Sequence, residues 1–330
     1  MKPVSDAAPL PIIALEEQII FSDVVSVSPQ DSAYYALLEP KYLEKLKNVG
    51  SSRIQHMRAA SIPMQVLSHV PVNCPPTACH KANDALHSVI LSKPTRFSAF
   101  ALLSLDNPTE AAHELVRCTS KLKFVGGMIN HHHNGEFLDA EQFRPIFAAA
   151  EQFDIPLYIQ SHYPSSQHLQ YYRGNYPESI AHHIATFDLG AHSEVAICVL
   201  RLFAAGVFDR FPRLKIIIGQ MGQTIPFVLD RIVNLTQWWR EKPCRDFGEV
   251  WYNNIWVTTS GMFSLAPMSC LVNTMPADRI MFSVGYPFSE NEAGRNFLAD
   301  LKASGLVTQA EYDGIAYKNA EKLLGIRVKK

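Results

Sequence analysis

The sequence predicts a closed barrel of eight parallel strands, each followed by a helix: a (β/α)8 TIM barrel of the α/β class. Short runs that are apolar nearly throughout alternate with longer amphipathic stretches, and such runs are typical of parallel strands covered on both faces. Eight such units fit a chain of 330 residues, within the usual size of such a barrel. An open, doubly wound sheet is the alternative, but the G-x-G-x-x-G fingerprint that often marks it does not occur.

The expected strands are recognised by their apolar letters. The first, IIALEE, ends in two carboxylates, and the later ones have a similar apolar body. In chain order, the strands are expected at 12–17, 64–69, 96–103, 124–130, 155–160, 214–219, 254–259 and 279–284.

Amphipathic stretches lie between these strands. The stretch 108–122 begins with Pro-Thr-Glu and spaces its apolar residues three and four positions apart, as a helix with one buried face does. The same pattern is found at 139–153, 193–208 and 311–326. Gly206 and Gly325 stand near the ends of expected helices, where a left-handed cap is needed.

One long segment interrupts the alternation. Residues 161–192 follow the fifth expected strand and are polar and aromatic. Loops that follow strands form the active-site face of a barrel, so we expect this segment to be a lid or a contact between subunits. The segment 237–252, rich in Trp and charge, is expected to act similarly. With no internal repeat and no low-complexity tract, residues 1–330 are expected to form a single domain.

The composition excludes several classes of protein. Apolar residues make up 47% of the chain and charged residues 18%, with a formal net charge of -1 and no basic block. A large core is therefore expected, and a nucleic-acid partner is not. The six cysteines are scattered; Cys74 and Cys79 could close a small loop, but we expect free thiols. Without a signal peptide or a run of about 18 apolar residues, we expect a cytoplasmic protein with no membrane partner.

Polar residues gather at the expected strand ends, where barrels place their catalytic groups. Three of these ends carry glutamine, although such sites usually need groups that titrate or bind metal. The residues at these ends are Glu16, Glu17, Gln18, Ser68, His69, Asn130, His131, His132, His133, Gln160, Ser161, His162, Gln220, Gln223, Thr258, Thr259, Ser260, Gly285 and Tyr286.

With these motifs the chain resembles the amidohydrolase-related, aminocarboxymuconate-semialdehyde decarboxylase-like family, and within it the γ-resorcylate and 2,3-dihydroxybenzoate decarboxylases. The resemblance runs from about residue 12 to 326 and implies a (β/α)8 barrel, usually dimeric or tetrameric, with one divalent metal and nonoxidative C–C bond cleavage. Its carriers are ALEEQ (14–18), RFSAFALLSLDNP (96–108), KFVGGMIN (123–130), DIPLYIQ (154–160), GVFDRFPRLKIIIGQMGQTIPF (206–227), IWVTTSGMFS (255–264), ADRIMFSVGYPFSEN (277–291) and KNAEKLLGI (318–326).

The chain departs from this family at its metal and proton-transfer positions. The family's first strand ends in Glu-x-His, its fifth in a metal-binding histidine, its sixth in Gly-His-Met-Gly-Glu and its eighth in an aspartate ligand. Here Glu16 survives, but the other five positions hold Gln18, Gln160, Gln220, Gln223 and Gly285.

These replacements change the expected chemistry. Zinc or manganese needs imidazole or carboxylate ligands, and a neutral amide carbonyl is a poor substitute. Gln220 and Gln223 cannot exchange a proton near neutral pH. We therefore expect no catalytic metal and no cofactor, but a rigid pocket whose amides orient and polarise a carbonyl or phenol. A metal held by Glu16 with the histidines at 131–133 stays open as an alternative.

Three residues are candidates for catalysis: Glu16, His131 and His162. Burial should raise the pKa of Glu16 and make it a general acid or base; otherwise it is a relic bonded to nearby amides. The histidines at 131–133 cannot all face inward, so one is expected to act as acid or base, with solvated loop histidines as the alternative. His162 is expected to donate or accept a proton in the pocket.

The remaining pocket candidates are expected to bind substrate: Gln18, His69, Asn130, Gln160, Tyr163, Gln220, Gln223, Tyr286 and Phe288. His69 could instead be a satisfied histidine at a strand end. By strand alternation, Glu17 is expected to point out of the barrel. Ser193 or Glu194 is expected to cap a helix.

The sequence thus favours a metal-independent lyase, decarboxylase-like, acting on a small aromatic or polyketide-derived substrate in secondary metabolism. A homo-oligomer, dimer or tetramer, is expected. Two alternatives stay open: a cyclase or isomerase that uses the neutral pocket, and a catalytically inactive protein that binds ligands or acts as a scaffold.

Overall fold

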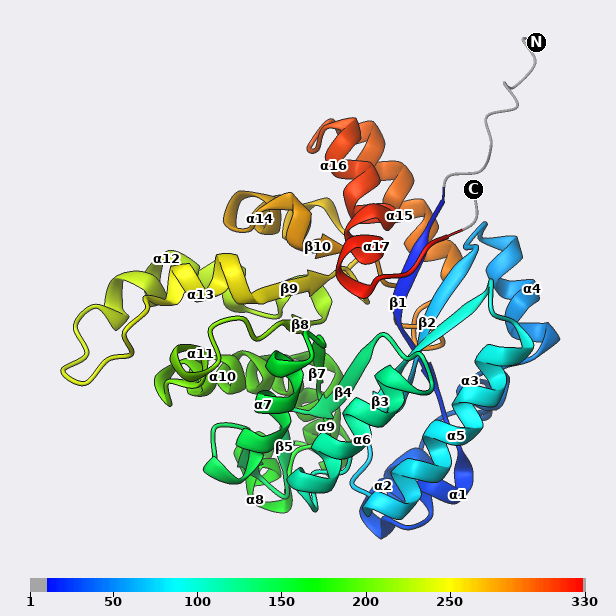
Figure 1. Cartoon of the computed structure of the whole chain (residues 1–330), viewed down its shortest axis with the longest axis horizontal. Helices are drawn as coiled ribbons and strands as arrows, with labels where there is room; N and C mark the ends of the chain where they lie inside the picture. Colours follow the sequence, from blue (N-terminus) through cyan, green and yellow to red (C-terminus); the bar gives the residue numbers. More distant parts are fainter. Residues whose placement is uncertain (1–10, 329–330) are drawn as a thin grey trace.

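Eight parallel strands form the barrel in the computed structural model, which describes residues 11–328 (Figure 1). Each lies where the sequence predicted a strand, within two residues at either end except β10, which ends three residues earlier than predicted. In the order of the sheet they are β1 (Ile13–Ile19), β2 (Met64–His69), β3 (Phe97–Leu102), β4 (Gly126–Asn130), β7 (Leu157–Gln160), β8 (Ile216–Ile218), β9 (Ile255–Thr258) and β10 (Ile280–Met281).

The last strand returns to the first. Leu15 of β1 forms a bridge to Ser283, and its backbone N–H donates to the carbonyl of Phe282 at 3.1 Å. The sheet is therefore nearly closed, which confirms the predicted barrel and makes the open-sheet alternative wrong.

The helices surround this sheet. They are α1 (Ser22–Val25), α2 (Pro29–Tyr35), α3 (Pro40–Lys47), α4 (Ser51–Ala59), α5 (Pro76–Ser92), α6 (Pro108–Ser120), α7 (Arg144–Gln152), α8 (Ser166–Leu169), α9 (Glu178–His183), α10 (Gly190–Ala204), α11 (Val207–Arg210), α12 (Ile225–Thr236), α13 (Phe247–Asn254), α14 (Leu265–Thr274), α15 (Asn291–Ser304), α16 (Gln309–Asp313) and α17 (Asn319–Leu324). Single turns of 3₁₀ helix add η1 (Glu141–Phe143), η2 (Gln170–Tyr172), η4 (Gln220–Gly222) and η5 (Ala277–Arg279), and π-helical turns add η3 (Ile184–Asp188) and η6 (Gly314–Lys318).

The predicted glycine caps are confirmed. Gly206 has a φ of 69° and separates α10 from α11, so the single helix predicted over 193–208 is two helices. Gly325 has a φ of 65° and ends α17. Left-handed backbone of this kind costs glycine nothing but strains a residue with a Cβ.

Alternate residues of each strand enter two separate apolar layers. Val66, Phe100 and Ile217 belong to the cluster inside the barrel, whereas Leu67 and Ile218 belong to the cluster between the strands and the helices. Both faces of the sheet are thus buried, which is why the strands contain so few polar residues.

The long segment after β7, residues 161–192, is named here the insert. It is largely helical, with α8, η2, α9 and η3, so His182 and His183 lie on α9. A hairpin of β5 (His132–His133) and β6 (Glu136–Phe137) lies outside the barrel sheet. The labels α8, α9 and β5 appear together at the lower left of Figure 1.

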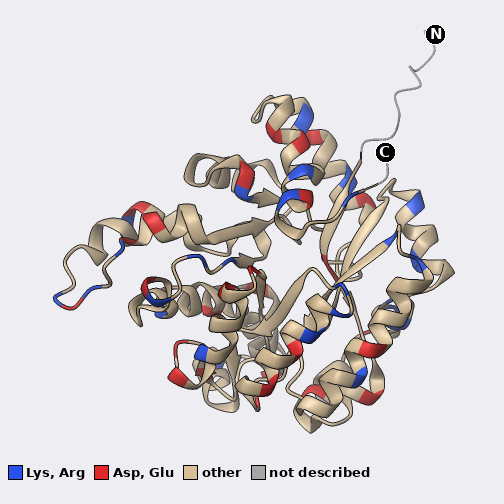
Figure 2. Cartoon of the chain, in the orientation of Figure 1, with Lys and Arg blue, Asp and Glu red and all other residues tan. Residues whose placement is uncertain are grey.

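The surface carries charges of both signs, and the cysteines are unpaired. Basic and acidic residues are interspersed along the outer helices in Figure 2. Within residues 11–328, none of the helices combines the length and apolar character needed to cross a membrane. The cysteines are free thiols, as predicted; the sulfurs of Cys74 and Cys79 lie 3.1 Å apart without a bond.

Candidate active site

A cavity of about 140 Å³ lies where strands β1, β7 and β8 end. It is smaller than the roughly 300 Å³ at which pockets for drug-sized ligands begin, so it suits a ligand of a single ring. Its walls are Gln18, Tyr34, Tyr35, Pro71, Gln160, Ser161, His162, Tyr163, Thr186, Phe187, Ala191, His192, Gln220 and Phe288.

A bulge in β1 decides which of its polar residues face the interior of the barrel. The register against β2 shifts by one residue between Ala14 and Glu17, and Glu16 takes a positive φ of 63° there. An extra residue of this kind turns the following side chains to the other face. Glu16 and Gln18 consequently point inward, while Glu17 points outward.

Glu17 lies on the helix side of the strand, as predicted, but without contact with solvent. Its carboxylate accepts the backbone N–H groups of Val284 at 2.8 Å and Tyr286 at 2.9 Å. Burial raises its pKa to about 7, although these bonds and the charge of Arg53 oppose the change.

Glu16 lies beneath the cavity and is absent from its walls. The hydroxyls of Thr258 and Ser260 donate to its Oε2 at 2.8 Å and 2.5 Å. Burial raises its pKa, and the hydroxyl bonds, including that of Tyr158, only partly offset this. Because a Cβ on Gly219 would come within 2.8 Å of Glu16 Oε1, only glycine allows the backbone to pass so close.

Two of the amides that line the cavity belong to Gln160 and Gln220. The Oε1 atoms of Gln160 and Gln220 are buried and have no hydrogen-bond partner. A turn of 180° about the last side-chain bond would present the NH2 group instead. Each amide therefore offers either a donor or an acceptor to a ligand.

Gln223 lies one step behind the wall. It accepts a hydrogen bond of 2.6 Å from Nδ1 of His192, which does line the cavity. The backbone that carries both glutamines is left-handed, with φ of 53° at Gln220 and 62° at Gln223. Such strain in residues with a Cβ is typical of functional turns.

The residues at the family's ligand positions do not fit a divalent ion. Gln18 and Gln160 are neutral amides, and Gly285 has no side chain. The one carboxylate, Glu16, already accepts hydroxyl protons from the strand ends around it. One carboxylate and two amides are a weak ligand set for zinc or manganese.

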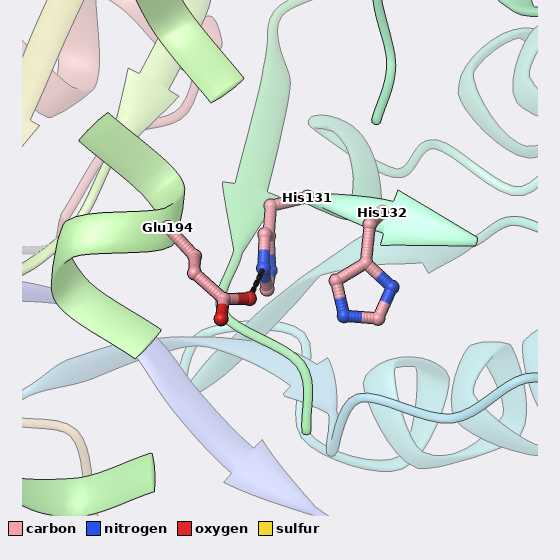
Figure 3. A group of neighbouring side chains, drawn as sticks. All are labelled: His131, His132 and Glu194. Atoms are coloured by element: carbon pink, nitrogen blue, oxygen red, sulfur yellow. Dashed lines mark hydrogen bonds and ion pairs between the residues drawn. The ribbon is translucent and has the colours of Figure 1, made fainter. Parts of the chain in front are cut away.

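A second group of side chains has the spacing of a metal site. His131, His132 and Glu194 each offer a ligand atom within 4.8 Å of the others (Figure 3). However, the backbone N–H of His162 donates to His131 Nδ1 at 3.0 Å, so that Nδ1 holds a lone pair and Nε2 carries the proton. This Nε2–H donates to Glu194 Oε2 at 3.0 Å.

His132 is held in the same way. Its Nδ1 accepts the N–H of Gly135 at 3.3 Å, and its Nε2–H donates to the carbonyl of Tyr163 at 2.9 Å. A histidine must present a lone pair to bind a metal, and neither His131 nor His132 has one free. The group is therefore a hydrogen-bond network.

One histidine of the cavity wall does keep a free ring nitrogen. His162 Nε2 donates to Asp31 Oδ1 at 3.0 Å, and both side chains are buried. Its Nδ1 is buried and has no partner. Asp31 Oδ2 accepts the N–H of Asn73 at 2.8 Å. Burial alone would raise the pKa of Asp31, but the hydrogen bond and charge of His162 lower it overall.

The predicted site residues divide into two groups. Six line the cavity: Gln18, Gln160, His162, Tyr163, Gln220 and Phe288. The other six do not: Glu16, His69, Asn130, His131, Gln223 and Tyr286.

Three of the second group are corrected from substrate contacts to structural residues. His69 donates from Nδ1 to the carbonyl of Val70 at 2.7 Å and accepts the N–H of Phe21 at 3.0 Å, while burial lowers its pKa to about 4. Asn130 donates to the carbonyl of Val72 at 3.2 Å. Tyr286 belongs to the outer apolar cluster, with its hydroxyl 2.7 Å from Nδ1 of His56.

Sequence reasoning missed the acidic partners of the histidines. Asp31 is in the first turn of α2, where an acidic residue usually complements the helix dipole, and it meets His162 across 131 positions. Glu194 is not a cap, because α10 already begins at Gly190. It is buried and accepts hydrogen bonds from His131 and from the hydroxyl of Tyr172, the latter at 3.0 Å.

The aromatic wall was also missed in part. Tyr34 and Tyr35 come from α2 and Phe187 from the insert. Their sequence neighbourhoods carry no motif, so only the fold brings them to the strand ends.

Known proteins are similar to this chain along almost its whole length. The model of the amidohydrolase family matches residues 39–326. Decarboxylase orsB of Emericella nidulans is 38% identical over 329 residues, covering 97% of this chain and 98% of that protein. A γ-resorcylate decarboxylase of Rhizobium sp. is 31% identical over 303 residues, covering 84% and 88%.

Solved structures show the same fold. A dihydroxybenzoic acid decarboxylase from Polaromonas sp., solved with bound manganese and the inhibitor 2-nitroresorcinol, superposes with a TM-score of 0.83 at 27% identity. The match covers 96% of this chain and 97% of that one.

Proposed function

Because this chain belongs to the amidohydrolase family, we propose that it is a lyase that decarboxylates a small aromatic acid without a metal ion. Relatives that cover most of the chain are named decarboxylases, and a cavity of about 140 Å³ with aromatic walls suits one substituted ring. We propose a reaction without a metal ion because amides and a glycine stand at the family's ligand positions.

One observation carries the proposal. His162 lines the cavity, its Nδ1 is buried without a hydrogen-bond partner, and Asp31 holds its Nε2 at 3.0 Å. A carboxylate in this place fixes the ring and stabilises the imidazolium form, as in other catalytic Asp–His pairs. His162 thus supplies a proton in a chain that lacks most of the titratable strand-end groups of its family.

The reaction consumes one proton. His162 Nδ1–H gives its proton to the ring carbon that bears the carboxylate. The C–C bond to the carboxylate then breaks, its electron pair returns to the ring, and CO2 leaves. His162 recovers a proton from solvent, so that the aromatic carboxylate and one proton become the arene and CO2.

The amides hold the substrate for this step. A phenol O–H can donate to the unpartnered oxygens of Gln160 and Gln220, and their NH2 groups can instead donate to a carboxylate. An ortho-hydroxy acid supplies both kinds of group side by side. Fixed dipoles of this kind stabilise charge as it develops without reorganising.

The insert is proposed as a lid over this site. It contributes half of the cavity wall: Ser161, His162, Tyr163, Thr186, Phe187, Ala191 and His192. Three of these side chains, Tyr163, Phe187 and Ala191, are apolar or aromatic and so exclude water from the ring.

A homo-oligomer, dimer or tetramer, is also proposed. Phe227 on α12 is 86% exposed and Trp238, just beyond that helix, is 83% exposed. Large aromatic side chains exposed together favour an interface. Analytical ultracentrifugation tests this, and a monomer across the micromolar range would contradict it.

The decisive experiment is a substrate panel of hydroxybenzoic acids, with alkylated members that represent polyketide-derived acids of secondary metabolism. We expect CO2 and the corresponding phenol at the same rate with and without a chelator, and one deuterium on the ring in D2O. Loss of activity with the chelator would overturn metal independence.

Other products would favour the alternatives. A cyclised or rearranged product without CO2 would indicate the cyclase or isomerase, which the neutral amide wall also suits. Binding of acids without turnover would indicate a ligand-binding or scaffold protein.

A further inference from the structure

We propose that His131 and Glu194 form a positioning pair that holds the peptide of His162, and that Tyr172 and His168 of the insert fasten this pair. The effect on catalysis rests on the proposed function, whereas the hydrogen-bond chain itself does not. Figure 3 shows Glu194 and His131, the middle of this chain of contacts, with His132 beside them.

The chain runs from the insert to the cavity through buried atoms. Tyr172 Oη–H donates to Glu194 Oε1 at 3.0 Å, and His168 Nδ1 lies 3.5 Å from Glu194 Oε2. Glu194 Oε2 accepts from His131 Nε2–H at 3.0 Å. His131 Nδ1 in turn accepts the backbone N–H of His162 at 3.0 Å.

His131 and Glu194 each have a defined protonation state. Burial keeps the pKa of His131 below its ordinary value in spite of the neighbouring carboxylate. Burial opposes ionisation of Glu194, but the bonds from His131 and Tyr172 lower its pKa overall. The pair is a neutral imidazole and a carboxylate, so His131 can accept from a peptide N–H and donate to Glu194 at the same time.

His132 completes the clamp from the next residue. Its Nε2–H donates to the carbonyl of Tyr163 at 2.9 Å. Two adjacent histidines therefore hold two adjacent residues of the cavity wall, one by its N–H and the other by its C=O. His131 and His132 therefore have a structural role, which is to hold the cavity wall, and do not act directly as acid or base.

These contacts fix the orientation of the His162 ring. Its Nε2 is tied to Asp31 on α2, and its peptide is tied to His131 at the end of β4. With both ends fixed, the His162 ring has one orientation in the cavity wall. Without Glu194, nothing holds the tautomer of His131 that accepts from the peptide, and His162 loses one of its two anchors.

The test compares three variants: Glu194→Ala, the conservative Glu194→Gln, and Glu178→Ala. Glu178 is a matched control because it is a glutamate of the neighbouring insert, is half exposed and pairs with Arg173 and His182 at the surface. We expect Glu194→Ala to lower kcat by ~10–100-fold, the usual cost of displacing a catalytic group by about 1 Å, with KM changed by less than ~3-fold. Glu194→Gln should restore most of kcat, and Glu178→Ala should leave it unchanged.

A second readout does not depend on turnover. In ¹⁵N-histidine NMR spectra, His131 should show a protonated Nε2 and an unprotonated Nδ1, and this signature should be lost in Glu194→Ala but kept in Glu194→Gln. If Glu194→Ala fails to fold, Glu194→Gln and Tyr172→Phe, measured by the same spectra, decide the question.

Three results would overturn the positioning pair: a protonated Nδ1 on His131 in the wild type, an unchanged kcat in Glu194→Ala, or a change confined to KM. Failure of the proposed function is separate. It would appear as a wild type that releases no CO2 from any acid of the panel, while the NMR signature would still establish or exclude the pair.

Discussion

The two sides of the cavity differ in the chemistry they hold. The strand-end side, from β1, β7 and β8, presents Gln18, Gln160 and Gln220, which neither titrate nor bind metal well. The remaining wall, from α2 and the insert, includes His162, whose ring is held by Asp31 of α2. In the relatives that the sequence resembles, the reacting groups are expected at the strand ends; here the titratable groups of the wall lie on the elements packed over them.

On the proposed function, this barrel keeps its pocket while its proton-transfer groups lie on the insert and not at the strand ends. Strand ends are fixed by the sheet, so replacing His or Glu by Gln there keeps size and hydrogen bonding. Loops and added helices tolerate larger changes. The following predictions test this division, beginning with the largest expected effect.

Replacement of His162 should abolish most turnover. His162→Asn removes the free nitrogen but keeps a polar side chain, and we expect kcat to fall by ~10²–10⁴-fold, the usual contribution of a general acid. The rate of CO2 release measures it. His113→Asn, on the exposed surface of α6, is the control. A variant of His162 that keeps more than a third of wild-type activity would return the proton transfer to the strand-end side.

Replacement of Asp31 should have the next largest effect. Asp31→Asn keeps the shape and the bond from Asn73 but removes the charge that stabilises the imidazolium, and we expect a ~10–100-fold loss of kcat.

The same variant has a signature in stability. The pKa of Asp31 is below its ordinary 3.8 in the folded chain, so the stabilisation by its carboxylate is complete above that value and fades as the pH falls below it. In urea unfolding, the difference between wild type and Asp31→Asn should therefore shrink from pH 6 to pH 3. A difference that grows toward low pH would contradict the assignment.

The amides should affect binding more than chemistry. We expect Gln160→Leu and Gln220→Leu each to raise KM by ~10-fold with a smaller fall in kcat, because each removes a contact made before the transition state. Steady-state kinetics measure both constants, with the exposed Gln152→Leu at the end of α7 as control. Unchanged KM in both variants would remove the amides from the substrate site.

Glu16 should have the smallest effect on turnover. It lies beneath the cavity, and Glu16→Gln keeps an acceptor for Thr258 and Ser260, so we expect kcat to change by less than ~5-fold, a small loss of transition-state stabilisation. A loss as large as that of His162→Asn would show that the surviving family carboxylate still moves the proton.

The sequence was sufficient for the barrel because its signal is local. Apolar runs such as 214–219 and the glycine at 206 carry their own structural preference, and the structure places β8 and the break between α10 and α11 accordingly. The amide wall could be predicted for the same reason, since alternation along a strand puts Glu16 and Gln18 on one face.

The titratable side could not be predicted in this way. Asp31 and His162 are 131 positions apart, and Glu194 and His131 are 63 apart, so no spacing connects them. His69 and Tyr286 were wrongly placed in the cavity because a strand end fixes the position of a residue but not the direction of its side chain. Both turn toward backbone or outer-layer partners instead.

The position of His162 at the very start of the insert has a consequence for how new variants of this chain arise. The insert shapes the space around the ring, so substrate preference would change most readily by exchanging it. Its second residue, however, is also the proposed acid, bound to α2 on one side and to β4 on the other. A chimera in which a relative's insert begins after Gln160 takes both the acid and the substrate preference from that relative. A graft that begins after Tyr163 keeps His162 of this chain and changes the substrate preference alone.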